Sequence, residues 1–450
     1  MMLSTALIAI DSTVLATAVP SIVDDVGGFS AFPWLFSVYL LAQAVTVPLC
    51  GKLADLFGRK PIMLAGIGLF LLGSILCGLA WSMGALIAFR VVQGLGAGAI
   101  APMTTTIAGD IYTTEERAKA QGYIAGMWGV ASVVGPALGG VFSEYTSWRW
   151  IFLVNVPLCL IAAGMVLRNF TERVERSRPA VDYTGAALLT GGLTLLILAL
   201  LEGGQRWAWA SPAGVGAVVV GVALLVGFLV VERRAEEPVL PLWVFRRRLL
   251  VSSGAASAAI GAVVFGLTSY IPTYVQDVLG AGPLVAGFAL ATLSFGWPIA
   301  ASQSGRIYLR VGFRVCAVIG TSIALAGTLL LLLLNEHTSV WQVAGTCLFI
   351  GVGMGLTNSP TLIAAQSSVG WHERGVVTAN NLFMRSVGSA VGIAVFGAIA
   401  NAVLGDGPRT PEKVTDAVQH IVVVIVGLSV VLLLAAIALP RTPRASEVTG

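Results

Sequence analysis

Three charged side chains lie deep inside apolar stretches of this sequence, where charge is rare. Asp11, Arg90 and Arg385 each sit within a run long enough to cross a bilayer. A charge at the centre of a span costs about 2.5–3.5 kcal/mol, so such residues usually face a partner or a water-filled cavity. Asp11 lies about ten residues, or roughly 15 Å, along its stretch, near the midplane where transporter sites gather. These three residues are the first candidates for chemistry.

Asp11 has the properties that proton exchange requires. Burial favours the protonated form of a carboxyl group, so its proton affinity changes when the cavity switches from one aqueous side to the other. The alternative is an Asp11 paired permanently with a base such as Arg385. Arg385 is then either the counter-charge or a ligand for a polar or anionic substrate group. Glu144, just beyond the stretch 118–143, is a second candidate for protonation, with an ordinary interfacial acid as the alternative.

Several uncharged polar side chains within the apolar stretches are candidates to line a substrate cavity. For each of them the alternative is a hydrogen bond between helices. These residues are Gln43, Asn155, Asn358, Asn380 and Asn381. Arg90, together with Gln93, is expected to brace the stretch 85–110 against the stretch 2–22, because the glycines around it indicate close packing.

The composition is that of a polytopic membrane protein. Hydrophobic residues make up 57% of the 450 positions, only 11% are charged, and the mean hydropathy is +0.90. A soluble core does not grow to this size, because soluble domains divide beyond roughly 250–300 residues. The five cysteines lack CxxC spacing, and neither HExxH nor GxSxG occurs. We therefore expect no metal site, no cofactor, no enzymatic activity and no nucleic-acid partner.

Apolar runs separated by turns and charges predict fourteen membrane-spanning helices. Their expected ranges are 2–22, 32–54, 62–80, 85–110, 118–143, 150–168, 182–201, 211–231, 249–275, 284–305, 314–334, 339–367, 375–402 and 418–439. The first range lacks a basic start and a clean cleavage site, so we expect a retained span at a short or trimmed N-terminus.

The basic residues predict the orientation of these helices. An even number of spans places both termini on one side of the membrane, and most of the 26 lysines and arginines fall on that side. The exceptions on the opposite side are Arg149, Arg206, Arg409 and Lys413. Because cytoplasmic loops are enriched in lysine and arginine, both termini are expected in the cytoplasm.

The second half of the sequence repeats features of the first. Residues 305–314 repeat the two glycines and the trailing base of residues 51–60, and the glycines of 351–353 repeat those of 94–96. Parallel repeats of this kind build many transporters. The chain is expected to divide into a six-helix bundle at 1–168, linkers with two inserted helices at 169–248, and a second six-helix bundle at 249–450.

Five segments carry a resemblance to a known family. Gly51 to Lys60 (GKLADLFGRK) lacks the spacing of a phosphate-binding P-loop. It resembles the loop between the second and third helices of the major facilitator superfamily. Leu86 to Gly98 (LIAFRVVQGLGAG) and Gly129 to Gly140 (GVASVVGPALGG) resemble its fourth-helix and antiporter fifth-helix motifs. With Asp11 to Pro20 (DSTVLATAVP) and Ser147 to Pro157 (SWRWIFLVNVP), the chain resembles the fourteen-helix drug:proton antiporter branch.

The resemblance implies a fold and a function. The implied fold is all-α, with two six-helix bundles and two inserted helices, and the implied activity is export of hydrophobic or cationic small molecules such as antibiotics by alternating access. A proton gradient drives such export, and no cofactor is needed. We expect a monomer in the cell membrane whose partners are a small hydrophobic or amphiphilic substrate and membrane lipid. The alternatives are a lipid or glycolipid exporter and a transport-dead receptor or scaffold. The first-helix motif usually has asparagine where this chain has Ala16.

The resemblance also implies a gate at the cytoplasmic end. The acid at Asp55 is expected to face the start of the helix near Gly375, where negative charge is favourable. The base at Arg59 is expected to meet an acid at Asp110. The other residues assigned to the gate or its supporting helices are Gly51, Gly58, Lys60, Arg90, Gly135, Pro136, Gly139 and Gly140.

Overall fold

The computed structural model describes residues 1–27, 34–172, 182–203, 207–208, 210–235, 238, 241–404 and 410–440. The regular structure in these ranges is helical, apart from an isolated bridge between Gly203 and Trp207. The expected all-α class is therefore confirmed. Arg206, Arg409 and the linker 173–181, which enter the topology argument, lie outside the described residues.

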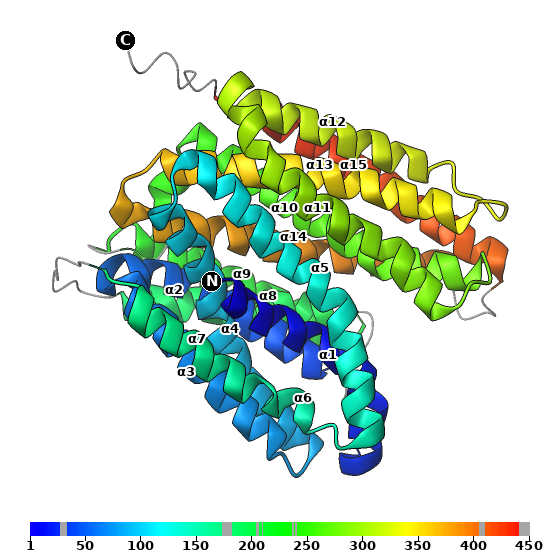
Figure 1. Ribbon diagram of the computed structural model, residues 1–450, viewed down its shortest axis with the longest axis horizontal. Helices are drawn as coiled ribbons and strands as arrows, with labels where there is room; N and C mark the ends of the chain where they lie inside the picture. Colours follow the sequence, from blue (N-terminus) through cyan, green and yellow to red (C-terminus); the bar gives the residue numbers. More distant parts are fainter. Residues whose placement is uncertain are drawn as a thin grey trace.

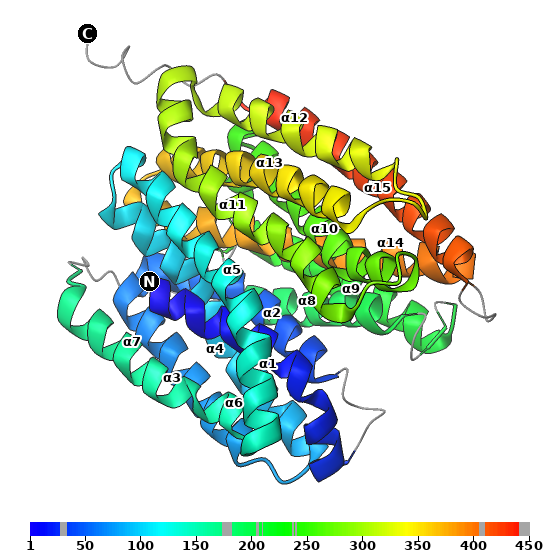
Figure 2. The same cartoon turned by 45° about the vertical axis from the view of Figure 1, so that its right-hand side comes forward.

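The helices run back and forth along one common direction (Figures 1 and 2). Their bounds are α1 Met2–Val26, α2 Trp34–Phe57, α3 Arg59–Gly78, α4 Met83–Ile111, α5 Thr114–Tyr145, α6 Trp150–Leu153, α7 Asn155–Asn169, α8 Tyr183–Glu202, α9 Pro212–Glu232, α10 Arg248–Asp277, α11 Pro283–Val311, α12 Phe313–Leu331, α13 Val340–Ser367, α14 Arg374–Leu404 and α15 Pro411–Ala438. Two short 3₁₀ helices, η2 Leu242–Phe245 and η3 Trp371–Glu373, precede α10 and α14.

Eleven helices in the described part of the chain are long and apolar enough to cross a bilayer. Here α6 and α7 together form one span, Trp150–Asn169. Helices α1 and α8 contribute the shorter apolar stretches Met2–Leu15 and Thr184–Ala199. The chain is thus a multi-pass membrane protein, while the expectation of fourteen spans stays a prediction.

Two sets of helices lie side by side. Figure 1 shows the first set, α1–α7, in blue to cyan-green, and the second set, α10–α15, in green to red, with α5 and α11 adjacent where they meet. Helix α8 covers the other side of the boundary, because Leu189, Leu193 and Ile197 pack in one cluster with Val45 of α2 and Phe383 of α14. Helix α8 therefore lies against the seam between the sets, and α9 packs on α8, with Phe228 in the same cluster.

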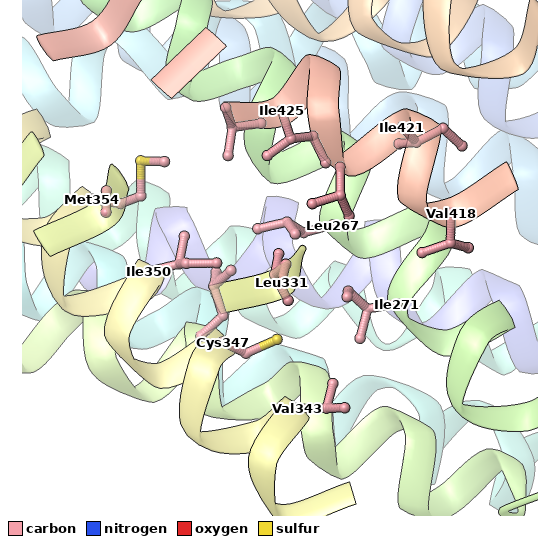
Figure 3. Packing of buried hydrophobic residues seen from close by; sticks show 14 of the residues in the cluster. Leu267, Ile271, Leu331, Val343, Cys347, Ile350, Met354, Val418, Ile421 and Ile425 are labelled. Carbon is pink, nitrogen blue, oxygen red and sulfur yellow. The ribbon is translucent and has the colours of Figure 1, made fainter. Parts of the chain in front are cut away.

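The second set has a continuous apolar core. Leu267 and Ile271 of α10, Ile350 of α13 and Ile421 and Ile425 of α15 are buried together (Figure 3). Lipid is as apolar as these side chains, so shape complementarity rather than exclusion of water holds such helices together. Small residues at the contacts matter for this reason.

Two glycines form equivalent turns in the two sets. Gly58, between α2 and α3, has φ 98°, and Gly312, between α11 and α12, has φ 86°. Residues with a Cβ rarely adopt these angles, so glycine permits both sharp turns. Both turns lie at the end of the helix bundle at which α1 begins and α15 ends. This end is hereafter called the latch end.

Glycines also repeat the same helix contacts in the two sets. A Cβ on Gly94 would meet the Tyr39 backbone oxygen at 2.6 Å, and one on Gly351 would meet the backbone of Leu293. The first contact joins α4 to α2 and the second joins α13 to α11. The expected repeat is thus visible as packing.

We predict that Gly73→Ala destabilises the protein whereas Gly68→Ala, on the same helix, does not. A Cβ on Gly73 would lie 2.5 Å from the Gln93 backbone nitrogen, while a Cβ on Gly68 has no neighbour within 4 Å. Overpacking costs about 1–3 kcal/mol, and a helical Gly→Ala change otherwise gains about 1 kcal/mol. Thermal unfolding in detergent measures both. Equal midpoints for the two variants would contradict the close packing of α3 on α4.

Candidate functional site

Asp11 lies at the centre of a buried polar cluster. Its carboxylate is 1% exposed and accepts hydrogen bonds from Arg90 Nη1 at 2.6 Å, Gln93 Nε2 at 2.8 Å and Asn155 Nδ2 at 3.3 Å. Ser74 Oγ accepts from Gln93 at 2.8 Å. Four helices, α1, α3, α4 and α7, thus contribute to one ion pair and its hydrogen-bond shell.

Arg90 is held on every side of its guanidinium. It donates to Gln93 Oε1 at 2.7 Å and to the Leu35 backbone oxygen at 3.2 Å. The Tyr39 ring lies 4.1 Å from the guanidinium carbon, and the Phe152 ring lies 5.9 Å away. Aromatic faces attract such a cation, most strongly where water is excluded. Arg90 therefore braces α4 against α1 and α2, as the glycine pattern indicates.

The cluster retains polar atoms that have no hydrogen-bond partner. Among the described residues these include Tyr39 Oη and Asn155 Oδ1, both buried. An unpaired polar atom in the membrane interior is costly unless a rearrangement or a water molecule satisfies it. Protonation of Asp11 leaves Arg90 without its counter-charge. Tyr39 Oη and Asn155 Oδ1 are then the unpaired acceptors in the same cluster.

The alternative in which Asp11 pairs with Arg385 is not the arrangement that the structure has. Arg90 is the cation at Asp11, whereas Arg385 belongs to α14 in the second helix set. Arg385 is half-buried, with its guanidinium 5.4 Å from the Trp297 ring, and no carboxylate in the described part of the chain forms an ion pair with it. Depth along a span, which the sequence indicates, does not determine which helices become neighbours.

The five expected cavity residues do not form one group. Asn155 belongs to the Asp11 cluster, and Asn381 Oδ1 accepts from Ser257 at 2.9 Å, so both make hydrogen bonds between helices. Gln43 and Asn358 are half-buried, and Asn380 is buried with no partner at its Oδ1. Glu144, the second candidate for protonation, is exposed at the end of α5 away from the latch.

Asp55 binds the start of α14 at the latch end. Its two carboxylate oxygens accept from the backbone N–H groups of Gly375 at 2.9 Å and Val376 at 2.7 Å. The first N–H groups of a helix lack partners within the helix and favour negative charge, so this contact is electrostatically strong. A Cβ on Gly375 would lie 2.5 Å from Asp55 Oδ1, so glycine permits the approach.

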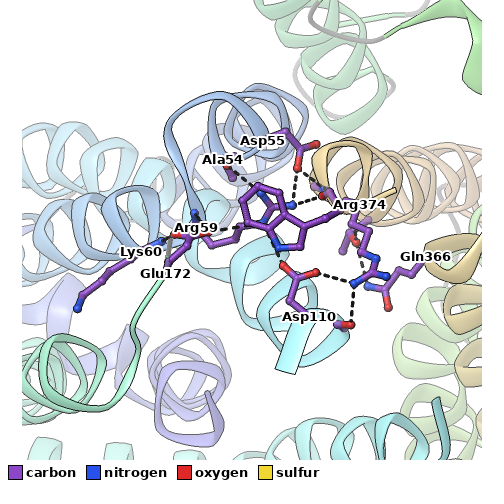
Figure 4. Close-up of polar contacts among 12 residues, drawn as sticks. Ala54, Asp55, Arg59, Lys60, Asp110, Glu172, Gln366 and Arg374 are labelled. Carbon is purple, nitrogen blue, oxygen red and sulfur yellow. Dashed lines mark hydrogen bonds and ion pairs between the residues drawn. The ribbon is translucent and has the colours of Figure 1, made fainter. Parts of the chain in front are cut away.

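Arg59 connects the same carboxylate to α4 and η3 (Figure 4). Its fully buried side chain forms ion pairs with Asp55 at 2.8 Å and Asp110 at 3.1 Å. It also donates to the Trp371 backbone oxygen, and its guanidinium carbon lies 3.5 Å from the centre of the Trp371 ring. Asp55, Arg59, Asp110, Trp371 and Arg374 are hereafter called the latch.

Three residues at the latch end were not identified as gate residues from the sequence. Arg374 of α14 donates to Asp110 at 3.0 Å, so each helix set supplies one base to this acid. Glu172 accepts from the backbone N–H groups of Arg59 and Lys60, both at 3.0 Å, and thereby caps α3. Trp371 stacks on Arg59. The Glu373–Arg374 pair repeats Glu116–Arg117, and this repeat was the sequence signal available for the region.

The remaining gate residues lie in two places. At the latch end, Gly51 packs against Ala379 of α14, and Lys60 Nζ donates to the Leu167 backbone oxygen at 3.0 Å. Within α5, Gly135 packs against the Thr13 side chain of α1, Gly139 is buried, and a Cβ on Gly140 would meet nothing within 4 Å. Pro136 also lies in α5, but its side chain falls outside the described residues.

A two-part helical membrane protein with a buried ion pair and a latch between its parts has the architecture of a secondary transporter. The family model of the Major Facilitator Superfamily matches residues 1–393, and the chain belongs to that family. It is therefore a transporter of this superfamily and not an enzyme.

Curated relatives are similar over most of their length. The multidrug transporter protein MdtP of Bacillus subtilis is 34% identical over 398 residues, covering 88% of this chain and 74% of the relative. Multidrug resistance protein 3 of the same organism is 34% identical over 391 residues, with coverage of 87% and 76%. The efflux pump FUS6 of Gibberella fujikuroi is 31% identical over 412 residues, with coverage of 89% and 74%.

A solved structure supports the fold. The human organic anion transporter MFSD10 (TETRAN) superposes with a TM-score of 0.69 over 97% of both chains, at 15% sequence identity. At that identity the likeness concerns the fold alone.

We predict that Asp55→Asn opens the latch end. The change removes the charge that faces both the α14 N-terminus and Arg59, and buried hydrogen bonds to charged groups contribute about 1.5–3 kcal/mol each. Loss of that free energy favours the open form, so a cysteine introduced at the buried Thr105 should react with maleimide roughly tenfold faster or more than in the protein with Asp55. Asp25→Asn, which removes a carboxylate paired with Arg149 at the opposite end, is the control. Unchanged labelling in Asp55→Asn counts against the latch.

We predict a smaller opening for Trp371→Ala. A desolvated cation–π contact contributes about 1–2 kcal/mol, which corresponds to roughly fivefold to thirtyfold in labelling rate at the same cysteine. Trp371→Phe keeps an aromatic ring over Arg59 and should label nearly as slowly as the parent protein. If Phe and Ala behave alike, the aromatic ring is not a latch component.

Proposed function

We propose that this protein is a proton-coupled exporter of hydrophobic or cationic small molecules, of the fourteen-helix drug:proton antiporter branch. It works in the cell membrane by alternating access, with the latch end and both termini in the cytoplasm. The names of the relatives, two multidrug transporters and a fungal efflux pump, support the substrate class.

The observation that carries the proposal is the buried Asp11–Arg90 pair. A carboxylate in the interior of α1 is stable because Arg90, Gln93 and Asn155 all donate to it. Protonation removes the negative charge and leaves Arg90 without a counter-charge, so the protonated and deprotonated forms favour different packing of α1 against α4. This is the property that couples a proton to a conformational change.

The latch is the proposed cytoplasmic gate. It joins α2 and α4 of the first helix set to η3 and α14 of the second, so it holds this end closed. We propose that residues 1–168 and 249–450 rock against each other about the central site, with the inserted helices of 169–248 remaining at the seam. Release of the latch then admits substrate from the cytoplasm or the inner leaflet.

The proposed substrate contacts lie on α11 and α14 of the second helix set. Arg385 is half-buried beside Trp297, and Asn380 Oδ1 is buried without a partner. Trp297 offers an aromatic face and Asn380 a hydrogen-bond acceptor to a hydrophobic or cationic amphiphile, while Arg385 suits a polar or anionic group of a hydrophobic substrate.

The energetics suffice for export. One proton moving through 100 mV releases about 2.3 kcal/mol, and each pH unit adds about 1.4 kcal/mol. Together these supply roughly 3–4 kcal/mol, which sustains a substrate gradient of about a few hundredfold.

We predict that Asp11→Asn abolishes efflux of a lipophilic cation driven by an imposed pH gradient in proteoliposomes. Asparagine preserves the shape but carries no exchangeable acid, so uphill transport should fall at least tenfold, toward the rate without a gradient. Glu144→Gln, at the exposed second candidate, should retain coupled efflux. Undiminished coupled efflux in Asp11→Asn removes Asp11 from the mechanism. Loss of coupled efflux in Glu144→Gln but not in Asp11→Asn assigns proton coupling to Glu144 instead.

A further inference from the structure

The latch end of the second helix set carries a run of three exposed arginines. Arg246, Arg247 and Arg248 follow η2 directly and lead into α10. The Arg247 guanidinium carbon lies 4.5 Å from the Trp243 ring centre, and Arg248 Nε donates to the Ala438 backbone oxygen of α15 at 2.8 Å. The run is therefore anchored to the protein surface at two points.

No carboxylate among the described residues neutralises these arginines. None of the three forms an ion pair with any described residue. Between residues 241 and 335 the only aspartate or glutamate in the sequence is Asp277, at the opposite end of α10. Within the described part of the chain, the repulsion among the three charges is thus left uncompensated.

The first helix set handles its bases differently at the same end. Arg59 pairs with Asp55 and Asp110, and the α3 N-terminus is capped by Glu172. A bias toward positive residues at this end accounts for topology in both sets. Topology alone does not account for a cluster that has acidic partners in one set and none in the other.

A further arginine belongs to the same part of the latch end. Arg314 is the second residue of α12. Helices α10, α12 and α15 meet here, because Leu249 and Val318 pack on one small cluster with Leu439. Three helix ends thus share one positively charged corner at the latch end.

The local backbone also favours an anion. Helix α10 begins at Arg248 with no side-chain cap, and Arg247 occupies the capping position. Basic residues at a helix N-terminus oppose the helix dipole, so a bound negative charge relieves both the dipole and the mutual repulsion. Phe245, 46% exposed, places an aromatic side chain beside the arginines, as is typical of the membrane interface.

From this charge pattern we propose that the corner formed by Arg246, Arg247 and Arg248 with Trp243 and Phe245 binds the headgroup of an anionic phospholipid. Guanidinium groups bind phosphate oxygens bidentately, and basic clusters beside membrane spans recognise anionic lipid. Phe245 lies against the acyl-chain boundary while the arginines hold the phosphate. The inference depends on the proposed orientation, which places this corner in the inner leaflet, and not on the substrate exported.

Native mass spectrometry of the full chain, released from nanodiscs of equimolar phosphatidylglycerol and phosphatidylcholine, tests the proposal. The parent protein should retain phosphatidylglycerol at least tenfold over phosphatidylcholine. R246Q/R247Q/R248Q should lose roughly tenfold to a hundredfold of that preference, because each arginine near the surface contributes about fivefold. R246K/R247K/R248K keeps the charge, and hence insertion, but loses the planar fork, so an intermediate preference is expected.

R233Q/R234Q is the matched control, because it removes two exposed arginines that directly follow α9 at the latch end. It should retain the parent preference. Equal retention of the two lipids by the parent protein overturns the proposal, as does an equal loss in the control and the glutamine variant. Inorganic phosphate, added to the parent protein in pure phosphatidylcholine nanodiscs, should not raise the thermal midpoint. A rise equal to that given by phosphatidylglycerol would show a free-phosphate site instead.

Discussion

The ion pair between Asp11 and Arg90 is the interaction on which the arrangement of the first helix set depends. Both side chains are 1% exposed, inside a protein whose surroundings are hydrocarbon. Removing one partner of a buried pair typically costs 3–5 kcal/mol, because the other charge remains buried. Gln93, Asn155 and the Tyr39 ring complete the shell, so four helices must stay in register to satisfy it. We therefore propose that protonation of Asp11 affects the packing of all four helices.

Helix α4 links this pair to the latch. It carries Arg90 and Gln93 in its first half and Asp110 at its end, about 30 Å further by helical rise. Its glycines bring it into close contact with α2 and α3. At the latch, Arg59 and Arg374 reach Asp110 from the two helix sets. We propose that proton exchange shifts α4 and that this shift reaches the contact that holds the two sets together.

The sequence predicted local features better than neighbours. Gly58 and Gly312 could be assigned to turns because positive φ restricts the residue type, and the resemblance placed Asp55 at the start of α14. The alternative pairing of Asp11 with Arg385 is not formed, because burial depth carries no information on which helices face each other. Trp371 and Glu172 were missed since an aromatic residue or an acid in a short loop has many possible roles. Hydropathy counted fourteen stretches, whereas eleven helices of the described chain meet the length and hydropathy requirement for a span.

We propose that proton binding at Asp11 controls the latch. Spin labels at Tyr112 and Ser368, exposed at the latch-end termini of α4 and α13, report the separation of the two helix sets. Double electron–electron resonance in nanodiscs, in acidic and alkaline buffer, should show a pH-dependent change in the distance distribution of the parent protein and none in Asp11→Asn. The same pH-dependent change in Asp11→Asn would contradict control of the latch by Asp11.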